Sequence, residues 1–253
     1  MADERQSLDS CTPWWGEHVH RYETVLPYLR AGDRVLDIAC GTGYGTAELS
    51  KHVGPSGAII GGDLSKEAID ACSTQWSTLP QAKFQVMDGT ALPFENDSFD
   101  RVVSFETIEH TPKYEQILQE FRRVLKPGGL AFISTPNRPV NSPGGMVTNP
   151  FHTQEFDYSE FTILMSRHYP GCTISGQSYS RYAGPATVRG AAASVVENLL
   201  YRRGIRKLPL SLQDKIMGAV RGGPLYPEPH DFTWVSDERS IRTCKTFFAL
   251  CKK

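Results

Sequence analysis

The amino-acid sequence predicts an α/β fold built around a doubly wound, mostly parallel sheet, and three observations support this prediction. Apolar runs typical of buried strands alternate with helical patterns over residues 35–134. The first apolar run ends in a glycine-rich turn that leads directly into a helical pattern. With 253 residues, the chain is long enough for one domain of this class with a substantial core. Such alternation favours parallel strands joined by right-handed crossovers.

The chain is expected to begin with a helical segment. Residues 12–30 have a helical pattern that includes the aromatic residues Trp14, Trp15, Tyr22 and Tyr28. We expect residues 1–30 to form a helical cap on the domain. The charged N-terminus is not followed by an apolar run, so we expect no secretory signal peptide and a cytoplasmic protein.

The first strand is predicted to end at an acid, Asp37, and to break into a turn that contains Gly41, Gly43 and Gly45. A helical pattern over residues 46–51 follows at once. A strand, a glycine turn and a helix in this order let a ligand approach the backbone closely, because no side chain stands in the way. This arrangement predicts a ligand site at the turn.

A second acid indicates what kind of ligand this is. Asp63 ends the next apolar run and follows Gly43 by twenty residues, where a second strand should place a carboxylate on a ribose hydroxyl pair. A dinucleotide fingerprint would require a small residue where this chain has Thr46. Asp37 is also unsuited to a pyrophosphate and better suited to a cationic ligand. The pattern therefore favours a nucleotide-type ligand that carries positive charge.

The remaining core elements follow in order. We expect a third strand over residues 84–89, which includes Asp88, and a fourth over residues 101–105. A helix should end near Lys126, and a Pro-Gly-Gly turn at residues 127–129 should lead into a fifth strand over residues 130–134. Cations in the last helical turn followed by proline and glycines are typical of a helix end.

These runs resemble the motifs of the class I S-adenosylmethionine-dependent methyltransferases over residues 18–177. The first motif of that family, D/E-x-G-x-G-x-G, differs here only at Ala39, which replaces its first glycine. The resemblance implies a Rossmann-like fold with an antiparallel closing strand, and S-adenosylmethionine as the cofactor. It implies that Asp88 binds the adenine amino group. The cofactor-binding residues it implies are Tyr22, Asp37, Ala39, Gly41, Gly43, Asp63, Leu64, Asp88, Gly89, Thr90, Ser104 and Phe105.

The C-terminal half of the chain is less regular. Residues 138–151 are rich in proline, glycine and asparagine, and we expect residues 138–152 to form a mobile lid. A helix is expected at residues 158–168 and a short strand at residues 173–175. Residues 178–240 should form an insertion with a helix at 186–203, before a closing strand at 245–250. We therefore expect one domain over residues 1–253, divided into a cap (1–30), a cofactor-binding core (31–137), a lid and substrate-side insertion (138–243) and a closing strand (244–253).

Candidate catalytic residues follow the fourth strand. Methyl transfer from a sulfonium is an in-line displacement that needs positioning and, for a hydroxyl acceptor, a base. His110 has the side chain suited to that task near neutral pH, and Glu106 lies close to it in the sequence. The alternative interpretation is that His110 caps a helix and packs under the cofactor.

The same segment resembles ubiquinone-pathway O-methyltransferases, in which two acids and a histidine at this spacing bind magnesium. Glu106, Glu109 and His110 match that pattern. Carboxylates suit magnesium but histidine is an unusual ligand for it. We therefore expect no metal, with Mg²⁺ at these three residues as the alternative.

Other candidates lie further from the motifs. His152 belongs to an Asn-Pro-Phe-His segment that resembles bacterial methyltransferases of glycan and natural-product pathways, and it is either a base or a loop anchor. In relatives, the N-terminal helix often closes over the cofactor, which implies contacts from Arg21 and Tyr22 to the methionine carboxylate. His20 belongs to the same helix. Weaker substrate-side candidates are Trp14, Trp15, His230 and Trp234.

Absences narrow the acceptor. The chain lacks the Asn/Asp-Pro-Pro-Tyr motif of many amino-group methyltransferases after the fourth strand, and no cysteine lies between Cys72 and Cys172 to act on cytosine. A formal charge of −1 disfavours nucleic acid. We expect a small-molecule acceptor, first a sugar or natural-product hydroxyl, then the nitrogen of an amine or amino sugar. A protein that binds S-adenosylmethionine without catalysis is the rival interpretation.

Composition adds three expectations. The six cysteines show no metal-binding spacing and are expected to be reduced thiols. No segment approaches the roughly 18 consecutive apolar residues of a membrane span. The sequence leaves a monomer and a homodimer equally open.

Overall fold

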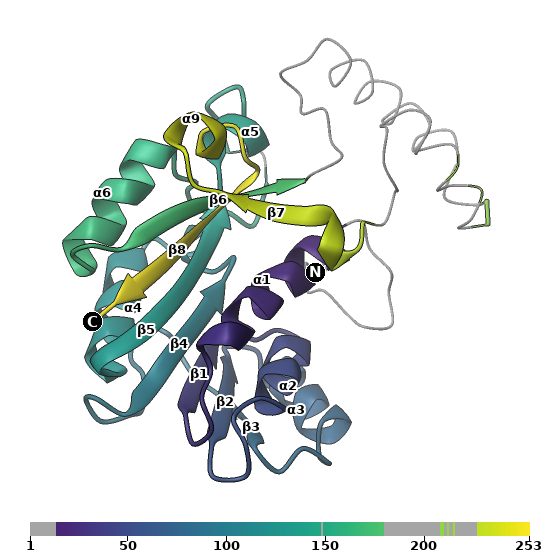
Figure 1. Cartoon of the computed structure of the whole chain (residues 1–253), viewed down its shortest axis with the longest axis vertical. Helices are drawn as coiled ribbons and strands as arrows, with labels where there is room; N and C mark the ends of the chain where they lie inside the picture. The colour runs from purple at the N-terminus through teal and green to yellow at the C-terminus, as the bar shows by residue number, and fades with distance from the viewer. Residues whose placement is uncertain (1–13, 148, 180–207, 210–211, 213–214, 216–226) are drawn as a thin grey trace.

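The computed structural model describes residues 14–147, 149–179, 208–209, 212, 215 and 227–253 (Figure 1). Within these residues, one sheet has the strand order β3-β2-β1-β4-β5-β8-β6-β7. Its strands are β1 (Arg34–Ile38), β2 (Ala58–Asp63), β3 (Ala82–Val86), β4 (Phe99–Phe105), β5 (Leu125–Pro136), β6 (Thr173–Tyr179), β7 (Phe232–Val235) and β8 (Thr246–Lys252).

The first five strands are parallel, as predicted. β1 lies at the centre, with β2 on one side and β4 on the other. The chain builds outward from β1 to β2 and β3, then crosses over to β4 and β5. This reversal makes the space between the carboxyl ends of β1 and β4 the switch point, where ligands bind in open α/β sheets.

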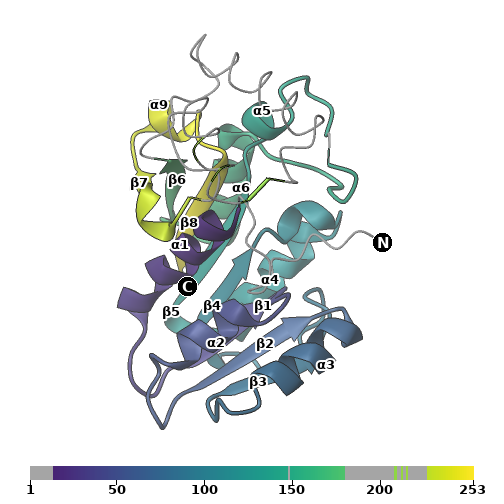
Figure 2. The ribbon, with the colours of Figure 1, turned by 90° about the vertical axis from the view of Figure 1, so that its right-hand side faces the viewer.

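Helices cover both faces of the sheet. α1 (Trp15–Val25), α2 (Tyr44–Ser50) and α3 (Lys66–Gln75) lie on one face, and α4 (Tyr114–Val124) and α6 (Tyr158–His168) lie on the other. Figure 2 shows α1 and α2 in front of the sheet and α6 behind it. The shorter helical segments are η1 (Leu26–Tyr28), η2 (Ile108–His110), α5 (Arg138–Asn141), η4 (Pro229–Asp231) and α9 (Glu238–Ile241).

Alternating strand residues fill two separate cores. Val35 packs with α1 and α2 in one buried cluster, and its neighbour Leu36 packs with α4 in the other. In β8, Phe248 packs in the cluster with Val35, and its neighbour Phe247 packs in the cluster with Leu36. Because successive side chains point to opposite faces of a strand, continuous apolar runs predict strands that are buried on both faces.

The antiparallel end of the sheet is larger than the sequence predicts. β8 pairs antiparallel with β5, which confirms the predicted closing strand. β6 extends to Tyr179, beyond the expected residues 173–175, and pairs with an unpredicted edge strand, β7. β6 and β7 are largely half-buried and contain polar residues and a glycine, so their sequences lack the apolar run of a central strand.

Several element boundaries differ from expectation, among them the end of β3, the start of β5 and the stretch that follows β5. β3 ends at Val86, so Asp88 lies in the loop beyond the strand rather than within it. β5 begins at Leu125, and the predicted Pro-Gly-Gly turn belongs to its irregular start, where the register with β4 shifts. The irregular stretch expected from Arg138 opens with the single helical turn α5. The boundaries of β3 and β5 depend on pairing with neighbouring strands, which local sequence does not specify.

Some predictions fall outside the described residues, including the helix expected at residues 186–203 and most of the insertion. Among the helices that the structure describes, none has the length and apolar character needed to cross a membrane.

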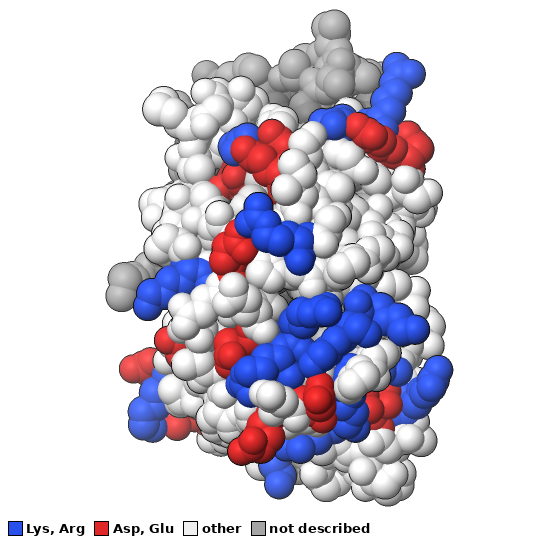
Figure 3. Space-filling model, turned by 90° about the vertical axis from the view of Figure 1, so that its left-hand side faces the viewer, with Lys and Arg blue, Asp and Glu red and all other residues white. Residues whose placement is uncertain are grey.

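The near-zero net charge conceals a local asymmetry. Figure 3 shows Lys and Arg side chains gathered in a band across one face of the molecule, with Asp and Glu side chains interspersed. In the described part of the chain, Lys126 Nζ lies 2.8 Å from Asp100 Oδ2, and Lys253 Nζ lies 2.7 Å from Asp97 Oδ1. Part of the basic charge is therefore paired within the protein.

Candidate active site

The candidate site lies at the carboxyl edge of the parallel strands. The loops after β1, β2, β3 and β4 meet there and carry most of the residues singled out in the sequence. We call the part formed by the loops after β1, β2 and β3 the cofactor edge. The part formed by the segments after β4 and β5 is the acceptor edge.

The glycine turn after β1 has an unusual backbone. Ala39, Gly41 and Gly43 all have left-handed φ angles, of 60°, 57° and 74°. At Gly43 a Cβ atom would also lie 2.7 Å from the Phe84 ring, so glycine is required there for both reasons. Ala39 adopts the left-handed conformation although it carries a Cβ, at a cost of about 1 kcal/mol.

Gly45 has a structural role that differs from that of Gly41 and Gly43. A Cβ at this position would lie 2.0 Å from the ring of Tyr22, so the absence of a side chain lets α1 pack directly on α2. The Tyr22 hydroxyl then donates a hydrogen bond to Asp37 Oδ1 at 3.2 Å. The glycine therefore belongs to a contact between two helices, which its place in the motif does not indicate.

Asp37 stabilises the glycine turn from inside the protein. It is fully buried, and its Oδ2 accepts a 2.6 Å hydrogen bond from Thr46 Oγ1 in addition to the Tyr22 contact at Oδ1. Burial raises the pKa of Asp37 to about 7, although both hydrogen bonds act in the opposite direction. Asp37 thus ties the end of β1 to α1 and α2. Its predicted contact with the cofactor stays a prediction.

Asp63 joins the end of β2 to the glycine turn. Its Oδ2 accepts a hydrogen bond from the Gly41 backbone N–H at 3.1 Å, and its Oδ1 accepts one from Ser65 N–H at 2.9 Å. Beside it, Leu64 is 71% exposed, an unusual state for a leucine. The acid and the apolar side chain lie together at the edge where a ribose and an adenine ring are expected.

The loop after β3 presents an exposed acid. Asp88 Oδ1 accepts hydrogen bonds from both the backbone N–H and the hydroxyl of Thr90, each at 2.8 Å. These bonds lower the pKa of Asp88, so the exposed side chain is ionised at neutral pH. Gly89 between them is buried.

The last two residues of β4 lie between the two edges. Ser104 is buried and donates a 3.0 Å hydrogen bond to Thr107 Oγ1. The Phe105 ring meets the edge of the Tyr22 ring at a centroid distance of 4.9 Å. Both predicted cofactor residues thus lie at the switch point.

Glu106 opens the acceptor edge and pairs with α1. Its backbone is left-handed, with φ of 49°, and its Oε1 accepts hydrogen bonds from Ser134 Oγ at 2.7 Å and Arg21 Nη1 at 3.1 Å. The Arg21 side chain is fully buried, and its Nε and Nη2 atoms have no hydrogen-bond partner among the described residues. Strong donors left unpaired in this way are costly unless a ligand or further protein atoms satisfy them.

Glu109 is the most perturbed acid of the acceptor edge. Its pKa lies well above the usual range, first because it is buried and second because of the negative charge on Glu106. Its Oε2 accepts a 3.0 Å hydrogen bond from Thr135 Oγ1. Its Oε1 has no hydrogen bond within the described chain and lies 3.7 Å from His110 Nε2.

The structure brings His110 and His152 together, 42 residues apart in sequence, with ring centroids 4.8 Å apart. His110 Nδ1 lies 3.1 Å from the carbonyl oxygen of Phe151, and His152 Nδ1 lies 2.8 Å from Glu155 Oε1. The sequence analysis did not select Glu155. The available signal was its position three residues after His152, which suits a carboxylate that orients an imidazole.

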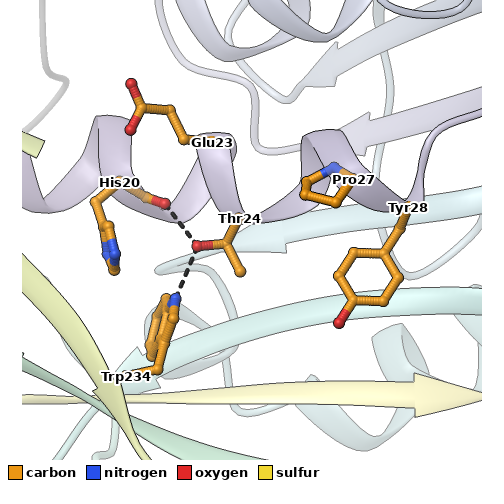
Figure 4. Close-up of a pocket in the computed structure, with 6 residues that line it drawn as sticks. All are labelled: His20, Glu23, Thr24, Pro27, Tyr28 and Trp234. Carbon is orange, nitrogen blue, oxygen red and sulfur yellow. Dashed lines mark hydrogen bonds between the residues drawn. The ribbon is translucent and has the colours of Figure 1, made fainter. Parts of the chain in front are cut away.

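The weaker candidates lie elsewhere. His20 and Trp234 stack at 5.0 Å and line a pocket of about 420 Å³ along α1, together with Glu23, Thr24, Pro27 and Tyr28 (Figure 4). Burial lowers the pKa of His20 to about 4. Trp14 is exposed next to Lys245, Trp15 packs on Tyr44, and His230 is exposed. The pocket contains none of the residues of the cofactor or acceptor edge.

The fold and the glycine turn define a doubly wound α/β protein of the Rossmann-like class, and comparisons identify its family. Residues 35–129 match the model of a methyltransferase domain. A probable S-adenosylmethionine-dependent methyltransferase of Mycolicibacterium smegmatis is 34% identical over 180 residues, which cover 65% of this chain and 68% of that protein. The chain belongs to the class I S-adenosylmethionine-dependent methyltransferases. Membership implies S-adenosylmethionine as the cofactor.

Two other relatives illustrate the range of the family. A demethylmenaquinone methyltransferase of Staphylococcus aureus strain JH9 is 37% identical over 112 residues. The matched region covers 44% of this chain and 46% of the relative. The chain therefore spans about half the length of that relative. The crystal structure of YcgJ from Bacillus subtilis superposes with a TM-score of 0.59 at 19% identity, over 93% of this chain and 98% of that one. The latter similarity concerns the fold alone.

Proposed function

We propose that this methyltransferase transfers the methyl group to a hydroxyl of a small molecule, a sugar or natural product. The observation that carries the proposal is the pair of imidazoles, His110 and His152, at the acceptor edge. An amine acceptor with a free lone pair needs no base, whereas a hydroxyl must lose its proton during transfer. Two histidines, one of them bonded to a buried carboxylate, suit a site that handles that proton.

The proposed reaction is a single displacement. The acceptor oxygen attacks the methyl carbon, the carbon–sulfur bond breaks, and its electron pair remains on sulfur, which becomes a neutral thioether. The hydroxyl proton leaves toward His110 or His152. Glu106, fixed by Ser134 and Arg21, would position the acceptor or the sulfonium. Most of the acceleration in such a displacement comes from alignment of the two reactants.

We further propose the following cofactor contacts. Asp63 accepts hydrogen bonds from the ribose hydroxyls, since its carboxylate lies at the end of β2 directly against the glycine turn, where it contacts the backbone N–H groups of Gly41 and Ser65. Asp88 accepts one from the adenine amino group, and the exposed Leu64 covers the adenine ring. The remaining predicted contacts, which the family resemblance implies, are Tyr22, Asp37, Ala39, Gly41, Gly43, Gly89, Thr90, Ser104 and Phe105.

The proposed lid is narrower than residues 138–152. Residues 143–146 are all exposed, and a Cβ added to Gly144 or Gly145 would meet nothing within 4 Å. The flanks are anchored: Arg138 pairs with Asp157, and Thr153 N–H donates to the Glu109 carbonyl at 2.8 Å. We therefore propose that residues 143–147 move over the acceptor while His152 remains fixed.

The test uses matched acceptors. Purified protein is incubated with methyl-labelled S-adenosylmethionine and pairs of pathway intermediates that differ only in a hydroxyl or an amine at one position. We expect S-adenosylhomocysteine to form with the hydroxyl member and the label to appear as a methyl ether in the product. A label found on nitrogen would replace the proposal with N-methylation. Cofactor binding without any turnover across the panel would favour a protein that does not catalyse methyl transfer.

A further inference from the structure

Three metal-ligand side chains converge at the acceptor edge. Glu109 and His110 come from η2, directly after β4, and His152 comes from the segment before α6. One potential ligand atom from each, a carboxylate oxygen or an imidazole nitrogen, lies within 4.8 Å of the other two. The backbone N–H of Thr153 donates to the Glu109 carbonyl at 2.8 Å, which joins the two segments directly.

The hydrogen bonds around the cluster orient its atoms as ligands. His152 Nδ1 faces Glu155 Oε1 at 2.8 Å and His110 Nδ1 faces the Phe151 carbonyl oxygen at 3.1 Å. Each contact assigns the ring proton to Nδ1 and leaves the lone pair on Nε2. An imidazole that donates to a carboxylate or a backbone carbonyl in this way is typical of metal-binding histidines.

The third ligand is a buried carboxylate oxygen. Glu109 Oε2 is held by Thr135, while Glu109 Oε1 is buried without a hydrogen bond among the described residues. It lies 3.7 Å from His110 Nε2. A histidine–carboxylate ion pair would account for these two residues, but it does not account for the third side chain, His152, at the same point.

We propose that Glu109, His110 and His152 bind a divalent first-row transition metal of the Zn²⁺, Mn²⁺ or Fe²⁺ type. Two imidazoles and one carboxylate suit these ions, whereas Mg²⁺ takes oxygen ligands. Glu106, which would supply a second carboxylate for Mg²⁺, is instead bonded to Ser134 and Arg21. The donor set therefore fits a transition metal better than the magnesium that the sequence resemblance implies.

Binding requires small local movements. Metal–ligand bonds of about 2.0–2.2 Å hold neighbouring ligand atoms about 3–3.5 Å apart, so the three side chains must close by roughly 1 Å. The Asn149 amide nitrogen lies 3.0 Å from His152 Nε2 and must swing aside. His110 is about one-third exposed, so the cluster is open on that side.

The role of the metal rests on the proposed O-methylation. A divalent ion bound here supplies Lewis-acid polarisation of an acceptor oxygen. In that case His110 and His152 would act as ligands, and the proton of the polarised hydroxyl would leave to solvent water rather than to either imidazole. Binding of the metal, in contrast, is a property of the three side chains and is measurable without any acceptor.

The test uses Co²⁺ as a spectroscopic probe of the full-length protein after removal of metals with a chelator. We expect one Co²⁺ per chain, with visible absorption of a site that contains nitrogen ligands, displaced by Zn²⁺ and not by Mg²⁺ at the same concentration. His110→Ala, His152→Ala and Glu109→Gln should each weaken Co²⁺ binding at least about tenfold, and Glu155→Gln about 10–100-fold. His52→Ala, which removes a surface histidine of the loop after α2, should bind Co²⁺ normally.

Calorimetry with S-adenosylmethionine verifies that each variant is folded. No saturable Co²⁺ absorption in protein that binds the cofactor would overturn the proposal, as would unchanged binding in both histidine variants. Displacement of Co²⁺ by equal Mg²⁺ would overturn the assignment to transition metals. Full methyl transfer to a hydroxyl by metal-free enzyme would overturn the metal's catalytic role and leave the proposed function intact. Normal Co²⁺ binding with no methyl ether formed would leave the metal site intact and contradict the proposed function.

Discussion

The cofactor edge and the acceptor edge of the sheet satisfy their polar groups in different ways. At the cofactor edge, the oxygens of Asp37 accept hydrogen bonds from side chains, and those of Asp63 accept them from backbone N–H groups. At the acceptor edge, polar atoms of Arg21, Glu109 and Glu155 are buried without a hydrogen bond among the described residues.

This difference indicates how each edge is built. The cofactor edge is organised before any ligand arrives, because its acids already hold the glycine turn and the adjoining helices in place. In the described part of the chain, the acceptor edge contains buried polar atoms without a hydrogen-bond partner, and such atoms carry a cost of about 1–3 kcal/mol each. A ligand that pairs with them gains that free energy on binding, so the acceptor edge is where specificity is expected to reside.

The largest expected effect is a loss of turnover, with unchanged cofactor affinity, when a residue of the acceptor edge is replaced. His152→Ala should reduce turnover by about 10²–10⁴-fold because the acceptor edge loses a group that handles the hydroxyl proton or a metal. The affinity for S-adenosylmethionine should not change, since the contacts of His152 with Asn149, Glu155 and His110 all lie in the segments after β4 and β5. Steady-state kinetics and calorimetry check both parts. Weaker cofactor binding with normal turnover would remove the distinction between the edges.

A second expectation concerns pH and the cofactor edge. The folded pKa of Asp37 is about 7 against an ordinary value of 3.8, so the folded state binds this proton more tightly than the unfolded state. Its contribution to the free energy of unfolding should therefore fall as pH rises between about 4 and 7. From pH 5 to pH 8 the loss should be roughly 2–3 kcal/mol.

Urea denaturation of the wild type and of Asp37→Asn measures this contribution as the difference between the two pH profiles. The variant should lack the fall assigned to Asp37 while the other titrating groups contribute equally to both proteins. Parallel profiles over the whole range would show that Asp37 is already ionised at low pH.

The third expectation is the converse of the first. Asp63→Asn should weaken S-adenosylmethionine binding by roughly 1.5–3 kcal/mol, the scale of a charge-assisted hydrogen bond. Turnover at saturating cofactor should change much less, because Asp63 lies at the cofactor edge. Calorimetry gives the affinity, and Asp70→Asn serves as a control because Asp70 is exposed on α3. An unchanged affinity in a folded variant would exclude Asp63 from the ribose site.

The fourth expectation concerns the proposed lid. Amide hydrogens of residues 143–147 should exchange rapidly in the free enzyme and about tenfold more slowly with S-adenosylhomocysteine and acceptor bound. The Thr153 N–H, which donates to the Glu109 carbonyl at 2.8 Å, should exchange slowly in both states. Exchange measured by mass spectrometry gives both values. Slow exchange of residues 143–147 in the free enzyme would make this segment a rigid loop.

The smallest expected effect is at Ala39. Its left-handed backbone costs about 1 kcal/mol, and glycine would relieve that strain but would lose more conformational entropy on folding. Ala39→Gly should therefore raise the free energy of unfolding by less than about 1 kcal/mol. Thermal denaturation measures the change. A destabilised variant would indicate that the Ala39 methyl group contributes packing that exceeds the strain.

The sequence predicted the parallel core well because its signals are local. Continuous apolar runs identify β1, β2 and β4, and the acid that ends the second run, Asp63, lies against the glycine turn after the first. What the sequence did not predict depends on contacts between distant segments. The fit of Tyr22 against Gly45, the pairing of Arg21 with Glu106 and the edge strand β7 arise only when the chain folds.

The candidate histidines illustrate the same limit. His110 and His152 were each selected from local segments, but their proximity depends on how the segments after β4 and β5 pack. Glu155 carries no motif of its own and becomes significant only through its 2.8 Å contact with His152. The magnesium pattern of Glu106, Glu109 and His110 is local in the sequence, yet the side chain of Glu106 pairs with α1.

Two neighbouring residues of α1 connect the edges. Tyr22 donates to Asp37 at the cofactor edge, and Arg21 donates to Glu106 at the acceptor edge. A displacement of this one helix would alter both contacts at once, so the free energies of binding the two substrates are expected to be linked through α1. Such linkage is reciprocal: the factor by which the cofactor changes acceptor affinity equals the factor by which the acceptor changes cofactor affinity. A substitution on α1 chosen to broaden acceptor choice would therefore also alter the retention of S-adenosylmethionine.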